Sequence, residues 1–169
     1  MRRILLWGLA LAVIVAAVWW TQLRPREARV EVFFLGPADG GSTLVPVART
    51  VRGRAPDELL AGALAALLAG PTPEERARGL VTEIPAGTRL RAVRVREGVA
   101  VIDLSGDVAT GGGSTSMQAR LWQLVYTGTQ LSAARQVRLL VDGQERPALG
   151  GEGLLIDRPI GRPPVPPQF

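Results

Sequence analysis

Apolar residues fill the start of the chain without interruption. From Ile4 to Trp20 there are 17 residues and no charge. As a helix they span roughly 25 Å at about 1.5 Å per residue, which just crosses a bilayer. Trp19 and Trp20 close the run, at the headgroup level that amphipathic rings prefer. The sequence therefore predicts an N-terminal transmembrane helix within an anchor and linker of residues 1–29. A signal peptide cleaved near Val15-Ala16-Ala17 is the alternative.

From Val30 the pattern changes to that of a soluble domain. Apolar residues alternate along 30–35 and predict a strand, which the turn residues Asp39-Gly40-Gly41 should end. Residues 44–51 predict a second extended segment. Because Pro46 has no N–H to donate, we expect this segment to lie at a sheet edge or to contain a bulge.

Helical spacing follows the two extended segments. A helix is predicted to begin at Pro56, with acidic residues in its first turn, and to stop at Gly70-Pro71. Thr72 and Glu75 then have the spacing of a capping box, with proline at the first helical position. We therefore expect a short second helix that starts within three residues of the first one and fixes a sharp corner.

A third helix is predicted over 117–128, after a glycine run at 111–113. Ser114 and Ser116 are the candidate N-cap residues. The glycine run lacks the spacing of either common phosphate-binding motif, so it predicts a flexible loop.

The remaining apolar alternation predicts strands. Val93 and Val95 precede the tight turn Glu97-Gly98, and the apolar segment 99–104 returns as the second arm of a hairpin. A further strand over 137–141 ends at the turn Asp142-Gly143. Together these elements predict the α+β class, with a single compact domain over 30–158 in which an antiparallel or mixed sheet packs against two main helices.

The last eleven residues, 159–169, contain five prolines and no apolar period. We expect an extended, polyproline-like and solvated terminus. Its overlapping P-x-x-P spacings leave a recognition role open as the alternative.

Composition removes most of the usual catalytic chemistry. The sequence has no His, Cys, Lys or Asn, so all 20 basic residues are arginine. This excludes disulfides, Cys/His zinc sites, histidine acid–base catalysis and lysine Schiff bases. We expect no cofactor, no metal and no enzymatic activity.

Charge adds little to this picture. The formal net charge is +5, and after Arg2 and Arg3 are set aside it is +3, with arginines scattered among acids. A nucleic-acid partner is therefore not expected.

Carboxylates, one tyrosine, hydroxyls and arginines are the side chains that remain for catalysis. Asp103 and Asp107, joined by Glu75, could act as paired acids in glycan hydrolysis. The competing interpretation is a strand end whose acids bind nearby main-chain N–H groups. Tyr126 could donate a proton, but a partly buried helix residue with a hydrated hydroxyl is the more common case.

Six segments stand out in chain order: Leu44–Arg49, Leu67–Thr72 with Glu75, Ile84–Thr88, Val101–Ser105, Tyr126–Gln130 and Val141–Gly143. Together they resemble the GerMN domain family of spore germination. Within them we take as the family signature, with a structural or interaction role, Gly70, Pro71, Thr72, Glu75, Pro85, Gly87, Asp103, Ser105, Asp142 and Gly143. The resemblance covers about Val30 to Pro159.

The resemblance implies a domain on the extracytoplasmic side of a membrane, a point that the arginines flanking both ends of the apolar run do not decide. Two features depart from the family. No lipobox Cys is present, and Gly128 stands where a larger apolar residue is more common, so the helix is expected to end or bend there.

The leading hypothesis is a non-catalytic interaction module, anchored through Ile4–Trp20, that binds an envelope protein or a peptidoglycan-associated complex. The alternatives are a carboxylate-dependent cell-wall glycan hydrolase and a sensor domain for a small ligand.

Overall fold

The computed structural model describes residues 26–151 and 153–169. The predicted membrane helix Ile4–Trp20 and its signal-peptide alternative lie outside these residues. Among the helices that are described, none has both the length and the apolar character needed to cross a bilayer.

Helices and strands alternate in the order that the sequence predicts, with several short strands added at the end. They are β1 (Arg26–Ala38), β2 (Gly41–Gly53), α2 (Pro56–Leu68), α3 (Pro73–Ala77), β3 (Leu90–Arg96), β4 (Val99–Leu104), the 3-10 helix η1 (Gly106–Ala109), α4 (Ser114–Gly128), β5 (Gln136–Val141), β6 (Gln144–Glu145), β7 (Ala148–Leu149), β8 (Leu154–Leu155) and β9 (Ile160–Gly161).

The strands form separate sheets, where one sheet was expected. β1 and β2 make a long antiparallel hairpin whose register runs from Arg26↔Gly53 to Ala38↔Gly41. A mixed sheet has the order β3-β4-β5-β6, with β9 also paired to β5; only the β4–β5 pair is parallel. β7 and β8 form a third, two-stranded sheet. The α+β class is confirmed.

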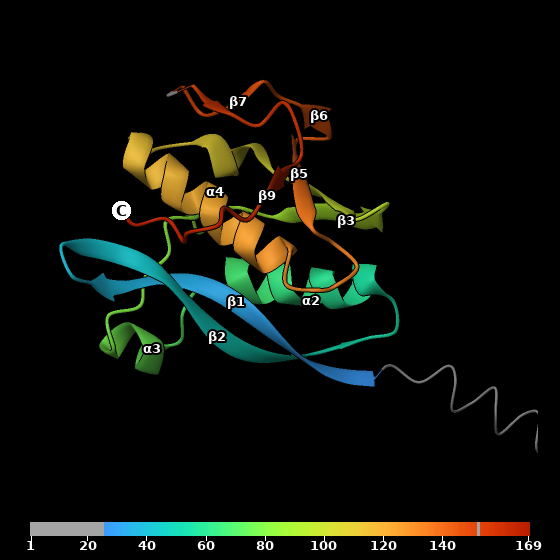
Figure 1. Cartoon of the computed structure of the whole chain (residues 1–169), viewed down its shortest axis with the longest axis horizontal. Coiled ribbons are helices and arrows are strands. Elements are labelled where there is room, and N and C mark those ends of the chain that lie inside the picture. Colours follow the sequence, from blue (N-terminus) through green and yellow to red (C-terminus); the bar gives the residue numbers. More distant parts are fainter. Residues whose placement is uncertain (1–25, 152) are drawn as a thin grey trace, which may run out of the picture.

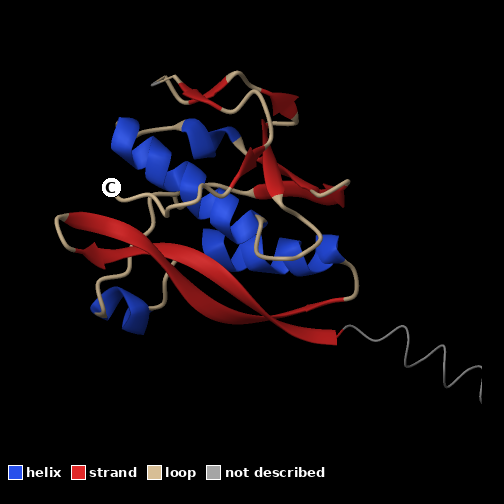
Figure 2. Ribbon diagram, in the orientation of Figure 1, coloured by secondary structure: helices blue, strands red, loops and turns tan. Residues whose placement is uncertain are grey.

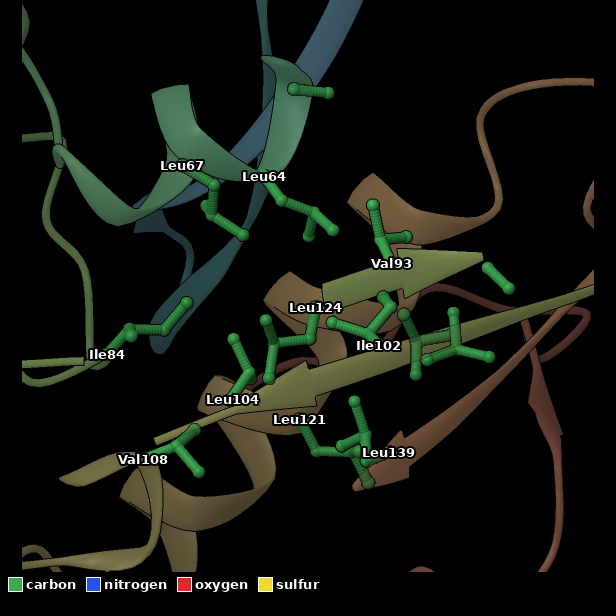
Figure 3. Packing of buried hydrophobic residues seen from close by; sticks show 14 of the residues in the cluster. Leu64, Leu67, Ile84, Val93, Ile102, Leu104, Val108, Leu121, Leu124 and Leu139 are labelled. Atoms are coloured by element: carbon green, nitrogen blue, oxygen red, sulfur yellow. The ribbon is translucent and has the colours of Figure 1, made fainter. Parts of the chain in front are cut away.

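The two main helices lie between the hairpin and the mixed sheet (Figures 1 and 2). α2 contacts β1, β2 and β3, and α4 contacts β1, β5 and α2. Leucines of both helices meet apolar residues of β4 and β5 in one core, as Leu64, Leu124 and Ile102 do in Figure 3, and all three are fully buried. Burial of this apolar surface on both faces of the helix layer supplies the main stabilisation of the fold.

The hairpin remains separate because the second edge of β1 has no strand beside it. Glu31 donates its main-chain N–H to Gln130 Oε1 (2.6 Å) and accepts at its carbonyl from Gln130 Nε2 (2.6 Å). Further along, Leu35 exchanges two main-chain hydrogen bonds with Val81, of 2.9 and 2.8 Å. The Gln130 side chain, just after α4, and the loop at Val81 therefore take the place of a neighbouring strand.

The main chain of Phe33, on the same edge of β1, binds two side chains of α4. Its N–H donates to Thr127 Oγ1 (3.2 Å), and its carbonyl accepts from Gln123 Nε2 (3.0 Å). Gln123 is fully buried, and its Oε1 accepts from the N–H of Glu83 (2.9 Å). We call these bonds from Glu31, Phe33 and Leu35 the β1 edge contacts. Residues 123 and 127 lie one turn apart on the same face of α4, and Gln130 follows shortly after the helix ends. Alternate residues of a strand direct their main-chain groups to one edge, so Glu31, Phe33 and Leu35 all face these partners or Val81.

α4 begins and ends for reasons that the sequence only partly shows. Its N-cap is Gly113, without a side-chain cap, so the prediction of Ser114 or Ser116 as N-cap is wrong. Ser116 instead donates to Glu83 Oε2 (2.5 Å). The helix ends at Gly128, as expected. A Cβ there would lie 2.5 Å from Val137 Cγ2, so the glycine allows α4 to approach β5.

The prediction of a solvated terminus over 159–169 is wrong at both ends of that segment. Ile160 and Gly161 form β9 and pair with β5. Phe169 exchanges main-chain hydrogen bonds of 2.9 and 2.8 Å with Ser42 on β2. A strand of two residues is too short to show an apolar period. The proline content of the segment therefore favoured an unpaired terminus, which was the wrong expectation. Pro46, in contrast, lies on β2, which forms a two-stranded sheet with β1, so its edge position is confirmed.

Replacing Gln123 with Ala should lower the free energy of unfolding by about 2 to 3 kcal/mol, because it leaves the Phe33 carbonyl and the Glu83 N–H buried without partners. Urea denaturation measures this difference. Gln118→Ala, at an exposed position of the same helix, is the matched control and should change stability by less than about 0.5 kcal/mol. Equal effects of the two substitutions would contradict a role for the β1 edge contacts.

Gly128→Ala should destabilise the protein although alanine favours helices by about 1 kcal/mol. The added Cβ would overlap Val137 and lie 3.1 Å from Ile102 Cδ1. Adding Val137→Ala should relieve the overlap, so the double variant should be more stable than the sum of the single effects predicts. Strictly additive free energies of unfolding would rule out this explanation.

Candidate functional site

The signature residues predicted from the sequence fall into two groups. Gly70, Pro71, Thr72 and Glu75 lie where α2 meets α3, and we call this group the α2–α3 corner. Pro85, Gly87, Asp103, Ser105, Asp142 and Gly143 lie around the ends of β4 and β5, and we call this group the β4–β5 end. Glu75 therefore belongs to a different group from Asp103.

The α2–α3 corner is built around one buried carboxylate. Thr72 caps α3: its Oγ1 accepts from the Glu75 N–H (3.3 Å), and its own N–H donates to Glu75 Oε2 (2.9 Å), which confirms the predicted capping box. Gly70 has a φ of 78°, a conformation that glycine adopts without strain. Buried Pro71 follows it, and its carbonyl accepts from the Arg76 guanidinium.

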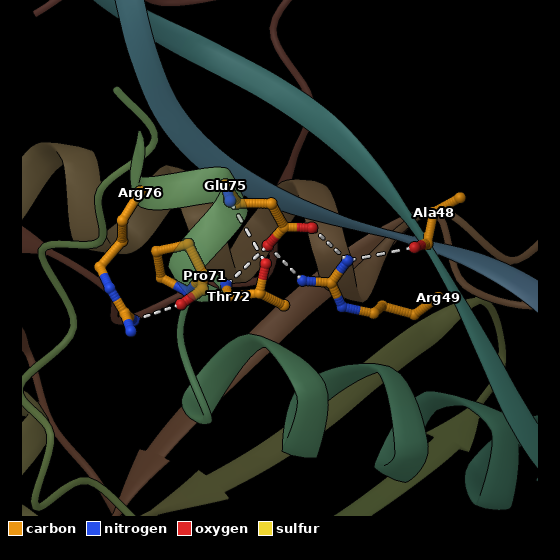
Figure 4. A network of polar contacts seen from close by, with 6 residues as sticks. All are labelled: Ala48, Arg49, Pro71, Thr72, Glu75 and Arg76. Atoms are coloured by element: carbon orange, nitrogen blue, oxygen red, sulfur yellow. Dashed lines mark hydrogen bonds and ion pairs between the residues drawn. The ribbon is translucent and has the colours of Figure 1, made fainter. Parts of the chain in front are cut away.

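Arg49 of β2 closes this corner from the hairpin side (Figure 4). Its two terminal nitrogens donate to Glu75 Oε1 (2.7 Å) and Oε2 (2.6 Å), a bidentate pair. Glu75 is only 5% exposed. The hydrogen bonds from Arg49 lower the pKa of Glu75, against the opposing effect of burial. The guanidinium also lies 5.7 Å from the centroid of the Phe34 ring. The ion pair therefore joins α3 to the hairpin.

At the β4–β5 end, Asp103 holds the turn that follows β5. Its Oδ1 accepts from the Gly143 N–H (2.8 Å), and its Oδ2 accepts from Arg91 Nε (3.3 Å). Asp142 and Gly143 both have positive φ, at 52° and 75°, which is typical of a two-residue hairpin turn with the sequence Asp-Gly. Arg91 also lies 3.8 Å from Asp142 Oδ1.

Ser105 connects the two chain segments on the other side of this end. It is 4% exposed; its Oγ accepts from the Arg89 N–H (3.0 Å) and donates to Asp107 Oδ2 (2.8 Å). Its own N–H donates to the Arg89 carbonyl (2.9 Å). Pro85 and Gly87 form the preceding turn, in which the Thr88 N–H donates to the Pro85 carbonyl (2.9 Å).

The three carboxylates of the hydrolase hypothesis therefore have separate partners. Asp103 binds Gly143 and Arg91, Asp107 binds Ser105, and Glu75 binds Arg49 in the other group. Asp103 and Asp107 occupy neighbouring elements, but each carboxylate accepts from a different donor. This is the arrangement of a strand end whose acids stabilise nearby turns.

Three open hollows mark the described surface. One of about 610 Å³ is lined by Glu97, Gly98, Thr129, Arg135, Gln136, Gly161 and Arg162. Another of about 270 Å³ lies between α2 and β3, and one of about 260 Å³ lies beside the β1–β2 turn. None of these three is lined by Asp103, Asp107 or Glu75. Within the described residues, no group of three or more acidic side chains could hold a metal ion.

Two arginines organise the fold although neither belongs to the signature predicted from the sequence. Arg49 lies in a segment that resembles the family, but its ion-pair partner is 26 residues away. Arg120 is 2% exposed on α4 and donates to the carbonyls of Glu83 (3.0 Å), Val108 (2.5 Å) and Thr110 (3.0 Å). Burial lowers the pKa of the Arg120 guanidinium, and the charge of Glu83 opposes this shift. An arginine on an apolar helix face is the available sequence signal for such a role.

Tyr126 has a more buried position than expected. It is 7% exposed, and its ring packs edge-on against Phe33 at 5.3 Å and against Trp122 at 6.5 Å. The side chain therefore contributes to packing between α4 and β1.

These features define an α+β domain with a long hairpin, two main helices and two groups of mutually bonded signature residues. The chain belongs to the family described as Germane, "Sporulation and spore germination", whose family model matches residues 31–147. The predicted family resemblance is thereby confirmed.

Solved structures share the fold. The tandem GerMN domains of the sporulation protein GerM from Bacillus subtilis are similar with a TM-score of 0.65 and 20% identity, covering 81% of this chain and 46% of that one. The chain thus spans about half of that tandem protein. The first GerMN domain of GerM alone gives a TM-score of 0.58 and 21% identity, over 80% of this chain and 98% of that one.

A protein of Clostridium perfringens, described as a candidate lipoprotein, gives a TM-score of 0.59 and 24% identity, over 80% of this chain and 88% of that one. At these identities the likeness establishes the fold alone. No curated protein sequence matches the chain.

Glu75→Gln should lower the free energy of unfolding at pH 7 by about 2 to 4 kcal/mol, because a neutral amide leaves the largely buried Arg49 guanidinium without its counter-charge. Denaturant titration measures the loss. The exposed pair Glu27–Arg52 supplies the control, since Glu27→Gln should cost less than about 1 kcal/mol.

The same difference should depend on pH. The folded protein holds the Glu75 pKa below its ordinary value of 4.5, so the stabilisation is complete above pH 4.5 and is lost as the pH falls through the folded-state pKa. Wild type and Glu75→Gln should therefore converge in stability in acid. A gap that is as large at pH 3 as at pH 7 would show that the ion pair is not its source.

Proposed function

We propose that this chain is a membrane-anchored, extracytoplasmic, non-catalytic interaction module of the bacterial cell envelope, acting in a peptidoglycan-associated assembly of the sporulation and germination type. The observation that carries the proposal is the family membership over residues 31–147. The similar Clostridium perfringens protein, described as a candidate lipoprotein, agrees with an envelope location.

Two further observations support a binding role. The reactive side-chain types His, Cys and Lys are missing from the sequence. The carboxylates of the hydrolase hypothesis, Glu75, Asp103 and Asp107, are engaged with Arg49, Arg91, Ser105 and Gly143. These carboxylates hold turns and helix ends. A general acid or nucleophile, in contrast, needs access to a substrate. The apolar run Ile4–Trp20 supplies the means of anchoring.

Sidedness and anchoring can be measured together. Alkaline phosphatase fused after Phe169 should be active and a cytoplasmic fluorescent reporter at the same place dark, and mass spectrometry should find Ile4–Trp20 retained in the membrane fraction. Replacing Leu11 and Val13 with Asp should release the chain from the membrane, because each acid costs about 2.5 to 3.5 kcal/mol at the centre of a spanning helix. Recovery of the unaltered chain in the cytosol would overturn the proposal.

The non-catalytic part has its own test. Purified protein incubated with muropeptides should leave them unchanged, while crosslinking in membranes should recover a protein partner. Turnover of muropeptides that disappears with Asp103→Ala would refute this assignment in favour of hydrolysis.

A further inference from the structure

A second, smaller apolar cluster lies on the outer side of α4. Its buried members are Phe33, Leu35, Leu44, Ala119 and Tyr126, and Trp122 and Phe169 pack partly buried against it. The three rings of Phe33, Trp122 and Tyr126 lie edge-to-face along β1 and α4. We call these three rings the aromatic surface. Trp122 also packs against the main core of Figure 3, so the aromatic surface adjoins that core.

Residues 162–169, which we call the tail segment, run across this surface. Figure 1 shows the chain leaving β9, crossing α4 and ending beside the hairpin turn. Arg162 lies over the rings of Phe33 and Tyr126, at 5.1 and 4.7 Å from their centroids. It also donates to the Tyr126 carbonyl (2.7 Å) and to Thr129 Oγ1 (2.8 Å). One guanidinium thus stacks and donates at once, which an ammonium group cannot do.

The tail segment is held at its two ends. Arg162 fixes the first end. At the other end, main-chain bonds join Phe169 to Ser42, and the Phe169 ring, which alanine would remove, packs against the apolar cluster. Between these ends, four of the five residues 163–167 are prolines without an N–H, and no hydrogen bond is described for this stretch. Val165 is 75% exposed. A segment with so few bonds can open locally, without unfolding of the core.

We propose that the aromatic surface is a docking site for an extended, proline-rich, arginine-bearing segment of a partner protein, and that the tail segment occupies this site within the same chain. The proposal rests on the proposed function as an interaction module and names its surface. Proline-rich segments bind aromatic surfaces because their extended form is already ordered, and an arginine gains from stacking on the rings.

The tail segment competes with a partner segment for the aromatic surface. A tethered segment acts at an effective concentration in the millimolar range, so a free peptide of equal chemistry competes poorly against it. Weakening the two attached ends of the tail segment removes this competition. The contacts under the tail, on α4 and β1, are left in place by such a change.

The test uses the full chain in detergent micelles and a fluorescently labelled synthetic peptide with the sequence of residues 159–169. Fluorescence anisotropy measures peptide binding to wild type and to Arg162→Ala/Phe169→Ala. We expect the variant to bind the peptide at least about tenfold more tightly than wild type does. A peptide whose arginine is replaced by alanine should lose about tenfold in affinity. Equal affinity of the peptide for both chains would overturn the proposal.

Trp122 provides a direct signal at the surface. Replacing Trp7, Trp19 and Trp20 with Phe leaves it as the single tryptophan of the full chain. Its emission should shift to longer wavelength in Arg162→Ala/Phe169→Ala and return when the peptide binds. An emission that the peptide does not change would place binding elsewhere and would refute the site.

Hydrogen exchange measured on the unaltered chain tests the proposal without any substitution, so it applies even if a variant fails to fold. The Ser42 N–H, bonded to Phe169, should exchange at least about tenfold faster than the Phe33 N–H, which is bonded to Thr127. Equal protection would mean that the tail segment leaves only when the domain unfolds, which overturns the proposal. Dimers that exchange tail segments would make a second copy the occupant and would also overturn it. None of these results affects membrane location, so the proposed function is tested separately.

Discussion

The main-chain groups on one edge of β1 bind side chains of α4 and of the loop that follows it, and much of the architecture depends on this arrangement. Gln123, Thr127 and Gln130 present amide and hydroxyl groups at the spacing of alternate strand residues. The hairpin is therefore complete without a third strand on that side. α4 is held against β1 by directional bonds as well as by apolar packing, and this places it between the hairpin and the mixed sheet. A strand edge closed in this way is also protected from pairing with another chain.

Local patterns in the sequence predict the elements whose cause is local. The capping box of Thr72 and Glu75, the turns at Glu97-Gly98 and Asp142-Gly143, and the stop of α4 at Gly128 each depend on a few neighbouring residues. Gln123 and Thr127 could not be assigned in the same way. Polar residues on a helix usually face water, and only the fold shows that these two face the edge of a strand about 90 residues away. The pairing of β9 with β5 involves two residues, too few to give a period.

In the candidate site, too, some features have local causes and others depend on tertiary contacts. Signature residues could be selected from the sequence, but their separation into the α2–α3 corner and the β4–β5 end depends on tertiary contacts. Arg49 shows why: its ion pair with Glu75 joins two elements that no local pattern connects. In a chain whose basic residues are all arginine, this side chain takes on tasks that need several donors at once. Arg49 is bidentate, Arg120 reaches four carbonyls, and Arg162 stacks while it donates.

The hairpin also sets the distance between two ends of the domain. Arg26 is paired with Gly53 at one end, and Ala38 with Gly41 at the other. Thirteen residues of extended chain reach up to about 40 Å at roughly 3.3 Å per residue. Phe169 is bound at the far end, beside Ser42. Arg26 and Phe169 therefore lie at opposite ends of the hairpin, so the point where the described domain begins and the point where its tail is bound are separated by the hairpin's full length.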